Sequence, residues 1–429
     1  MLLLGAALVP ALAPVLFAPE LWRLWIAYVV GTFVLLVIDA VGCALPGAVA
    51  GRVRPPERIY IGDRDPFALE IENLGRVAVE VRLHLDHDPE LDLRHVDRVR
   101  VPGRSVAEVA GTIGAARRGE FAVDRLWLRW RGPLGLLART KVVALDRKVP
   151  VVPNTRSVRA AALRFFTSPE FQTGLKVEQY LGDGSEFDSL REFQPGHDIR
   201  AIDWKATARH RRTMTREYRA ERNHDVVFAI DTGRLMGEPI DGLSRLDHAI
   251  NAFLLLGWCV LKTGDRAGLY AFDDRVRDFL RPSAGLATLH HLQRHASALE
   301  YGTGESNFTL ALSNLRVQLR RRTLVVVVTE FADSTTAELM VENVLRLTRR
   351  HLVVFVALRD SELEAVANAR PGETLDVHRS VVAGGMLRER RRVMVDLARR
   401  GVRCLDVRAA ELSTRLVNEY LEIKRRELV

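Results

Sequence analysis

The sequence predicts an α/β domain with a parallel sheet, preceded by a β-sandwich-like domain and two N-terminal transmembrane helices. Three observations lead to this prediction. Two almost uncharged apolar stretches open the chain, short alternating apolar and polar runs follow, and from Asp225 onward apolar strands alternate with helical patterns. These changes of pattern place the helical hairpin at 1–50, the β domain at 51–152, a linking segment at 153–222 and the α/β domain at 223–429.

The membrane prediction depends on the two apolar stretches. Leu2–Ala18 carries no charge, and Leu24–Leu45 carries only Asp39. A spanning helix needs about 20 apolar residues and at least about 17, so the second stretch is ample and the first is marginal. A signal peptide is the alternative for the first stretch. It is disfavoured because no basic residue precedes Leu2 and a second span follows closely.

Arginine placement predicts the orientation of the chain in the membrane. Arg23 is the only arginine in the turn between the spans, whereas Arg52, Arg54 and Arg58 follow the second span. The positive-inside rule therefore places the bulk of the chain in the cytoplasm, anchored to the inner membrane. We expect Asp39 to face the partner helix or to lie near the inner boundary, because a charge at depth is costly.

Composition narrows the classes of function. The net charge is +9, but acidic and basic residues are interleaved, so the arginine runs are interpreted mainly as solvated helix faces. The cysteines Cys43, Cys259 and Cys404 lie in apolar surroundings without CxxC spacing, which favours buried thiols in a reducing compartment over disulfides or zinc ligands.

The two predicted domains differ in where chemistry is expected. Alternating runs between Glu57 and Trp130, separated by turn residues, are typical of a β-sandwich and contain no cluster of catalytic type. In the α/β domain, three apolar strands end at Asp231, Asp273 and Glu330. Ligands of parallel sheets bind at the carboxyl ends of the strands, so the functional site is sought there.

A second candidate is the segment "REFQPGHDIRAIDWKATAR", Arg191 to Arg209, called the signature segment below. Its acidic residues and His197 suggest an active site, with Thr207 or Ser189 as a nucleophile. Yet most carboxylates have an arginine nearby, which favours permanent ion pairs, and the chain contains no Walker, HExxH, GxSxG or kinase motif. Catalysis is therefore disfavoured.

A binding surface fits the signature segment better. A helix is expected to place Ile199, Ile202 and Ala206 on one face, and tryptophan and arginine are the residue types that dominate interface hot spots. The expected partner-binding residues are Arg191, Asp198, Arg200, Asp203, Trp204, Lys205 and Arg209. An ordered insertion locked by its own salt bridges is an equal alternative. Nucleic-acid binding ranks third and is not expected, because glutamates interrupt the basic runs.

The signature segment, followed by "VVFAIDTGRLM", resembles the bacterial family called domain of unknown function 58, and "RRGEF…RGPLGLLART" resembles the end of that family's β region. The resemblance implies two N-terminal spans, a β-rich region and a domain similar to the von Willebrand factor A fold. It also implies a protein partner, a MoxR-type AAA+ ATPase. The expected function is that of a membrane-anchored cytoplasmic adaptor and not of an enzyme.

The von Willebrand A-like fold further implies a Mg²⁺ site with a D-x-S-x-S loop. Here the loop reads Asp231-Thr232-Gly233-Arg234-Leu235, so both serine positions are lost. Ser306 and Glu330 are the expected remaining ligands beside Asp231, and Arg234 could instead occupy the place of the cation. A degenerate site is expected, with no cofactor or at most Mg²⁺, and a metal-dependent binding switch is the alternative function.

Overall fold

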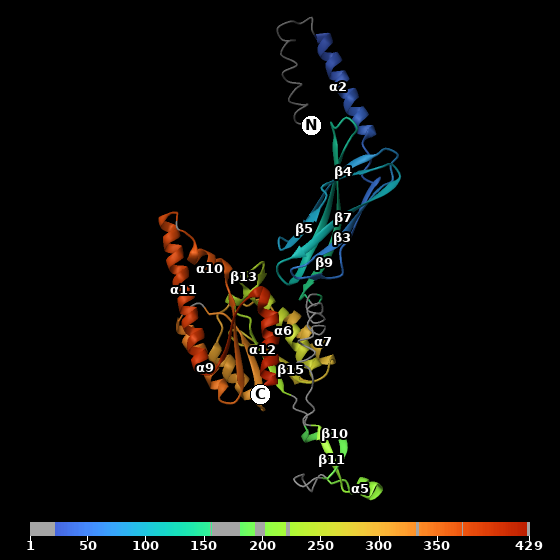
Figure 1. Cartoon of the computed structure of the whole chain (residues 1–429). Helices are drawn as coiled ribbons and strands as arrows, with labels where there is room; N and C mark the ends of the chain where they lie inside the picture. The colour runs from blue at the N-terminus through green and yellow to red at the C-terminus, as the bar shows by residue number, and fades with distance from the viewer. Residues whose placement is uncertain are drawn as a thin grey trace. The chain divides into compact units, whose positions relative to one another are not determined.

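A computed structural model describes residues 22–154, 156, 181–193, 202–219, 224–331, 334–370 and 372–426 (Figure 1). The chain divides into two compact units, Met1–Val152 and Pro153–Val429, which are treated separately below.

The N-terminal unit begins with one long helix, α2 (Trp22–Gly42). Its most apolar window has a mean hydropathy of 2.3, and in the described residues it is the one helix long and apolar enough to cross a membrane. Two spans were expected. The second corresponds to α2, and the first, Leu2–Ala18, lies outside the described residues.

The β-rich region predicted after the spans is confirmed and consists of two sheets. The first sheet contains, in spatial order, β1 (Val49–Arg54), β3 (Arg64–Asn73), β7 (Ser105–Ala115) and β5 (Leu91–His95). The second contains β2 (Ile59–Tyr60), β9 (Ala138–Val152), β8 (Gly119–Arg131), β4 (Val79–His87) and β6 (Arg98–Val101). The sheets face each other, because a Cβ on Gly51 of β1 would lie 2.8 Å from Leu126 of β8.

The C-terminal unit contains a six-stranded sheet in which most neighbours run parallel. Its spatial order is β16 (Val276–Ser283), β15 (Arg266–Phe272), β12 (Asp225–Asp231), β17 (Thr323–Val328), β18 (Leu352–Arg359) and β19 (Arg403–Arg408). The mixed α/β class is therefore confirmed. The edge strand β16 was not predicted and runs antiparallel to β15. Its partly exposed residues lack the continuous apolar run that revealed the central strands.

Helices cover both faces of this sheet. Those on one face are α6 (Arg245–Lys262), α7 (Ala287–Ala298) and α12 (Ala409–Arg425). Those on the other are α8 (Phe308–Gln318), α9 (Ser334–Thr348) and α11 (Thr374–Arg399). The short helix α10 (Ser361–Asn368) precedes α11.

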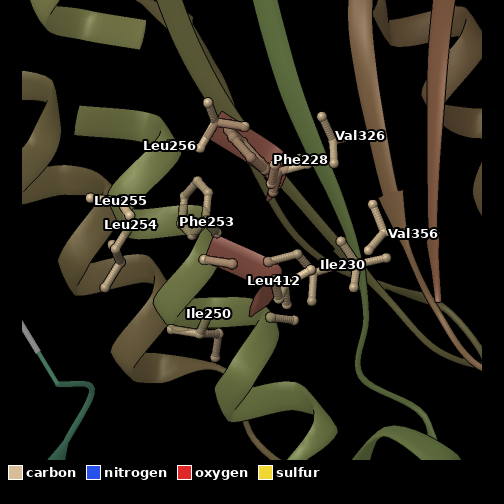
Figure 2. Packing of buried hydrophobic residues seen from close by; sticks show 14 of the residues in the cluster. Phe228, Ile230, Ile250, Phe253, Leu254, Leu255, Leu256, Val326, Val356 and Leu412 are labelled. Carbon is tan, nitrogen blue, oxygen red and sulfur yellow. The ribbon is translucent and has the colours of Figure 1, made fainter. Parts of the chain in front are cut away.

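The core explains why the central strands are almost wholly apolar. Side chains of β12 alternate between the two helical layers, so that Phe228 and Ile230 contact one layer while Val227 and Ala229 contact the other. Phe228 packs edge-on against Phe253 of α6, with ring centroids 4.6 Å apart (Figure 2). A strand buried on both faces needs apolar residues at every position.

Strand order places a topological switch point beside β12. From β12 the chain passes through α6, on one face of the sheet, to β15 on one side of β12. Strand β17 lies on the other side of β12, and the chain leaves it through α9, which covers the opposite face. At such a point the loops after two adjacent strands diverge and leave a crevice in which open α/β sheets bind ligands. The residues that follow β12 and β17 are therefore the first place to search.

Candidate functional site at the carboxyl edge of the sheet

Asp231, the last residue of β12, is the centre of the candidate site. Its carboxylate is buried, and Oδ1 accepts hydrogen bonds from Ser306 Oγ at 2.5 Å and from the Gly233 amide at 2.8 Å. Oδ2 accepts from Thr329 Oγ1 at 2.6 Å. Burial raises the pKa of Asp231 to about 6, although the bonds from Ser306, Thr329 and Gly233 oppose this shift.

The loop that contains Gly233 packs closely against the loop that contains Gly302 and Ser306, and this packing brings Ser306 to Asp231. A Cβ on Gly233 would lie 2.2 Å from Ser306 Oγ, and one on Gly302 would lie 2.5 Å from the Thr232 carbonyl oxygen. Glycine 233 therefore leaves the space in which the Ser306 hydroxyl reaches Asp231. A serine at position 233 would place its Cβ against the Ser306 hydroxyl, so the glycine found there is what permits this contact.

Glu330, which follows β17, has a different set of partners. Arg390 of α11 donates from Nη1 to both carboxylate oxygens, at 2.9 and 2.8 Å, and Nε of Arg245 lies 3.7 Å from Oε2. Arg245 also binds Glu238 at 2.8 Å and Asp360 at 2.9 Å. This buried network ties α6 and α11 to the ends of β17 and β18.

Asp273, which follows β15, is likewise paired. Nε of Arg277 lies 2.7 and 2.6 Å from its two carboxylate oxygens. Burial opposes ionisation of Asp273, but hydrogen bonds from Arg277 and from the Arg275 amide hold its pKa below the usual value. A cavity of about 490 Å³ lies beside this pair and is lined in part by Thr232, His295 and Tyr301.

The residues predicted to bind Mg²⁺ do not form a site that suits this ion. Asp231 and Ser306 are in contact as expected, but the two oxygens of Asp231 already accept three hydrogen bonds. Arg390 donates to both oxygens of Glu330 and Arg245 lies 3.7 Å from Oε2, so arginines already balance the charge of this carboxylate. Among the described residues, no three His, Cys, Asp or Glu side chains gather in a way that could hold a metal. Magnesium needs several open oxygen ligands in octahedral geometry.

The idea that Arg234 occupies the place of the cation is wrong for the described geometry. Its guanidinium is largely exposed and lies 3.8 Å from Glu238, four residues further along the chain. The 3-10 turn Arg234–Gly237, which directs this side chain outward, could not be deduced from the loop sequence. The stabilising donors for Asp231 are instead neutral hydroxyl and amide groups.

The signature segment forms part of a separate substructure. Strand β10 (Leu181–Glu192) pairs antiparallel with β11 (Met214–Arg219), and helix α5 (Trp204–His210) lies between them in sequence. Asp203 caps α5, because its Oδ1 accepts from the amides of Lys205 and Ala206 at 2.9 and 3.0 Å. This cap accounts for one of the carboxylates that had suggested catalysis.

The expected helical face of the signature segment is only partly correct. Ala206 is buried, as predicted, but Ile202 precedes the helix and forms a β-bridge with Thr215. The Asp203 cap fixes the start of the helix at Trp204, because the capping residue itself has extended backbone angles. Ile199 lies outside the described residues.

Trp204 is the most conspicuous of the expected partner-binding residues. It is 71% exposed at the first position of α5, and Lys205 and Arg209 are exposed on the same helix. Arg191 is exposed near the end of β10, where it pairs in register with Thr215. Asp198 and Arg200 lie outside the described residues, so five of the seven expected residues are placed.

Sequence reasoning missed two residues that complete the strand-end site. Thr329 directly precedes Glu330, and its place after an apolar strand was a signal that could have identified it. Arg390 lies in the run "RERRR", where nothing in the sequence distinguishes this partly buried arginine from its exposed neighbours. Its role depends on which face of α11 meets the sheet.

The fold and the site define a mixed α/β protein whose mostly parallel sheet follows a β-rich unit. Residues 189–381 match the family described as "Protein of unknown function DUF58". The resemblance noted in the sequence is confirmed over this range.

Similar curated proteins share only part of the chain. The uncharacterized protein Rv1480 of Mycobacterium tuberculosis (strain ATCC 25618 / H37Rv) is 24% identical over 152 residues, which cover 35% of this chain and 48% of that protein. The uncharacterized protein YeaD of Bacillus subtilis (strain 168) is 24% identical over 180 residues, 42% of each chain. The chain thus spans about half the length, or less, of the curated relatives it matches.

Solved structures also overlap parts of the chain. The conserved hypothetical protein BatB from Bacteroides thetaiotaomicron covers 47% of this chain and 99% of its own, with 14% identity and a TM-score of 0.30. Proximal thread matrix protein 1 from the mussel byssus covers 46% of each chain, with 11% identity and a TM-score of 0.27.

Proposed function

We propose that this chain is a membrane-anchored cytoplasmic adaptor that recognises a protein partner and catalyses no reaction itself. Helix α2 would anchor it, and the signature segment and the strand-end loops of the α/β unit would bind the partner. The α/β unit would be a variant of the von Willebrand factor A type. The partner that the sequence resemblance implies is a MoxR-type AAA+ ATPase, which would supply the ATP turnover.

The observation that carries this proposal is the exposed Trp204. A tryptophan that is 71% exposed on a short, capped helix leaves a large apolar surface in water. Tryptophan is enriched at the energetic centres of interfaces because its ring buries much area and loses little conformational entropy. Lys205 and Arg209 beside it would favour an acidic surface on the partner.

The strand-end site supports recognition over catalysis. Acid–base catalysis needs groups poised to exchange protons with a substrate. Glu330 and Asp273 are instead held in ion pairs with arginines, and Asp231 is enclosed by hydroxyl and amide donors. Such a fixed network supports the shape of the surrounding loops.

The test is capture of a purified MoxR-type ATPase by the full chain in nanodiscs. The Trp204→Ala variant is compared with Trp127→Ala, which removes another partly exposed tryptophan, from β8. A hot-spot aromatic residue contributes about 2 kcal/mol or more, so Trp204→Ala should weaken capture by about 30-fold or more. Trp127→Ala should leave capture unchanged.

Two results would contradict the proposal. Equal capture by the Trp204 variant and the unmodified chain, at equal folded yield, would show that the signature segment is internal scaffold. Hydrolytic turnover by the purified chain that disappears in Asp231→Asn would show that it is an enzyme.

A further inference from the structure

Asp39 connects the apolar helix to the β-rich unit. It lies in the last turn of α2 and is fully buried, at 0% exposed. Its Oδ1 accepts a hydrogen bond from the Leu134 amide at 2.7 Å, and Oδ2 accepts one from the Leu137 amide at 2.6 Å. A Cβ on Gly132 would lie 2.3 Å from Oδ1, so glycine is needed for this approach. Asp39 thus contacts the turn between β8 and β9 and fixes it to the helix.

Further hydrogen bonds fix the same junction. The Trp130 indole N–H donates to the Ala44 carbonyl oxygen at 2.9 Å, and Lys141 Nζ donates to that of Val49 at 2.6 Å. Arg139 donates to the carbonyl oxygen of Ala40 at 3.3 Å. The end of α2 and the ends of β8 and β9 therefore form one connected structure.

Two other turns lie at this end of the β-rich unit. The Leu74 amide donates to the Ala48 carbonyl oxygen at 2.8 Å, and the Arg104 amide donates to that of Gly75 at 2.8 Å. The turns 74–78 and 102–104 are thus joined to the segment that leaves α2. We call the four segments 43–48, 74–78, 102–104 and 132–137 the helix-side end.

The chemistry of the helix-side end is unusual for a surface in water. Its segments contain no aspartate or glutamate. Four large apolar side chains are exposed: Leu45 (66%), Leu74 (58%), Val77 (61%) and Leu134 (48%). Arg76 and Arg104 lie in the same turns and are exposed, as is the adjoining Arg131.

We propose that the helix-side end binds the headgroup layer of an anionic bilayer. The proposal rests on the anchoring of α2 in a membrane. Because Asp39 holds the turn 132–137 at the end of that helix, a bilayer crossed by α2 must meet this turn. Leucine and valine enter the boundary between headgroups and acyl chains, and arginine binds lipid phosphates while its stem remains in the apolar zone.

The experiment measures the depth of two labelled positions. The full chain, with its three cysteines replaced by alanine, receives one environment-sensitive fluorophore through Leu134→Cys or Glu90→Cys. Position 90 is exposed in the turn between β4 and β5, at the opposite end of the strands. Each protein is reconstituted into phosphatidylcholine vesicles, with or without phosphatidylglycerol, that contain lipids with a shallow nitroxide quencher.

The expected result is strong quenching at position 134, weak quenching at position 90, and an increase at position 134 when phosphatidylglycerol is added. Reversing Arg76, Arg104 and Arg131 to glutamate should abolish that increase. As a control, Arg58, Arg147 and Lys148, which are exposed away from the helix-side end, are changed to glutamate. This control variant should keep the increase in quenching at position 134.

Alkaline extraction separates the two ways of failing. If the chain resists extraction but position 134 is quenched no more than position 90, the inference is overturned while the membrane anchor stands. If alkali releases the chain, the anchor itself is wrong and the inference falls with it. If quenching at position 134 is the same with and without phosphatidylglycerol, the proposed role of the arginines is overturned.

Discussion

Arg390 donates to both carboxylate oxygens of Glu330, at 2.9 and 2.8 Å, across 60 residues of sequence. This contact fixes α11 to the carboxyl end of β17 in the interior of the α/β unit. Arg245 approaches the same carboxylate from α6, on the other face of the sheet, so Glu330 joins the two helical layers.

Removing Arg390 should destabilise the α/β unit strongly. An Arg390→Ala substitution leaves the buried Glu330 with only the more distant Arg245, and breaking a buried ion pair costs about 3–5 kcal/mol. The free energy of unfolding, measured by denaturant titration, should fall accordingly. Arg391→Ala is the matched control, because Arg391 is the exposed neighbour on the same helix. Equal losses in the two variants would contradict the prediction.

Asp231 should make stability depend on acidic pH. Its pKa is raised from 3.8 to about 6 in the folded chain, so between these values the folded state holds a proton that the unfolded state has released. Stability should therefore decrease as pH rises through this window, by an amount on the order of 3 kcal/mol, and remain lower above it.

Asp231→Asn should remove this dependence. Its amide oxygen can keep the bonds from Ser306 and Gly233, and its amide nitrogen can donate to Thr329. We expect the variant to be at least as stable as the unmodified chain at pH 7.5, with a flatter profile between pH 4 and 6. Unfolding transitions measured across that range test this, and an unchanged slope in the variant would assign the effect to other groups.

Gly233 and Ser306 should be energetically coupled. Gly233→Ala places a Cβ against the Ser306 hydroxyl, and inserting a methyl group into a packed site costs about 1–3 kcal/mol. In the background of Ser306→Ala that hydroxyl is absent, so the second alanine should cost less. A double-mutant cycle measures the difference, and strict additivity would show that the clash relaxes elsewhere.

Magnesium should not stabilise the chain. A ligand present at a hundredfold excess over its dissociation constant raises stability by about 2.7 kcal/mol. Because the oxygens of Asp231 and Glu330 are already engaged, millimolar Mg²⁺ and EDTA should give the same melting temperature. A reproducible increase with Mg²⁺, lost in Asp231→Asn, would restore the metal-dependent switch as a candidate.

The sequence by itself determined the elements whose signal is local. The apolar run Trp22–Gly42, the alternating strands of the β-rich region and the buried strands of the α/β unit follow from hydrophobic periodicity, which one segment carries alone. The position of Asp231 at a strand end follows from the same pattern.

Only the tertiary structure decided which polar groups meet. Thr329 and Ser306 approach Asp231 from separate loops, and the face that α11 turns to the sheet determines which arginine of the run "RERRR" contacts Glu330, namely Arg390. The partners of Asp39 could not be predicted for the same reason, because they are amides about 95 residues away in the sequence. Such contacts depend on long-range packing, and a charged side chain has no local pattern that reveals whether water or another residue satisfies it.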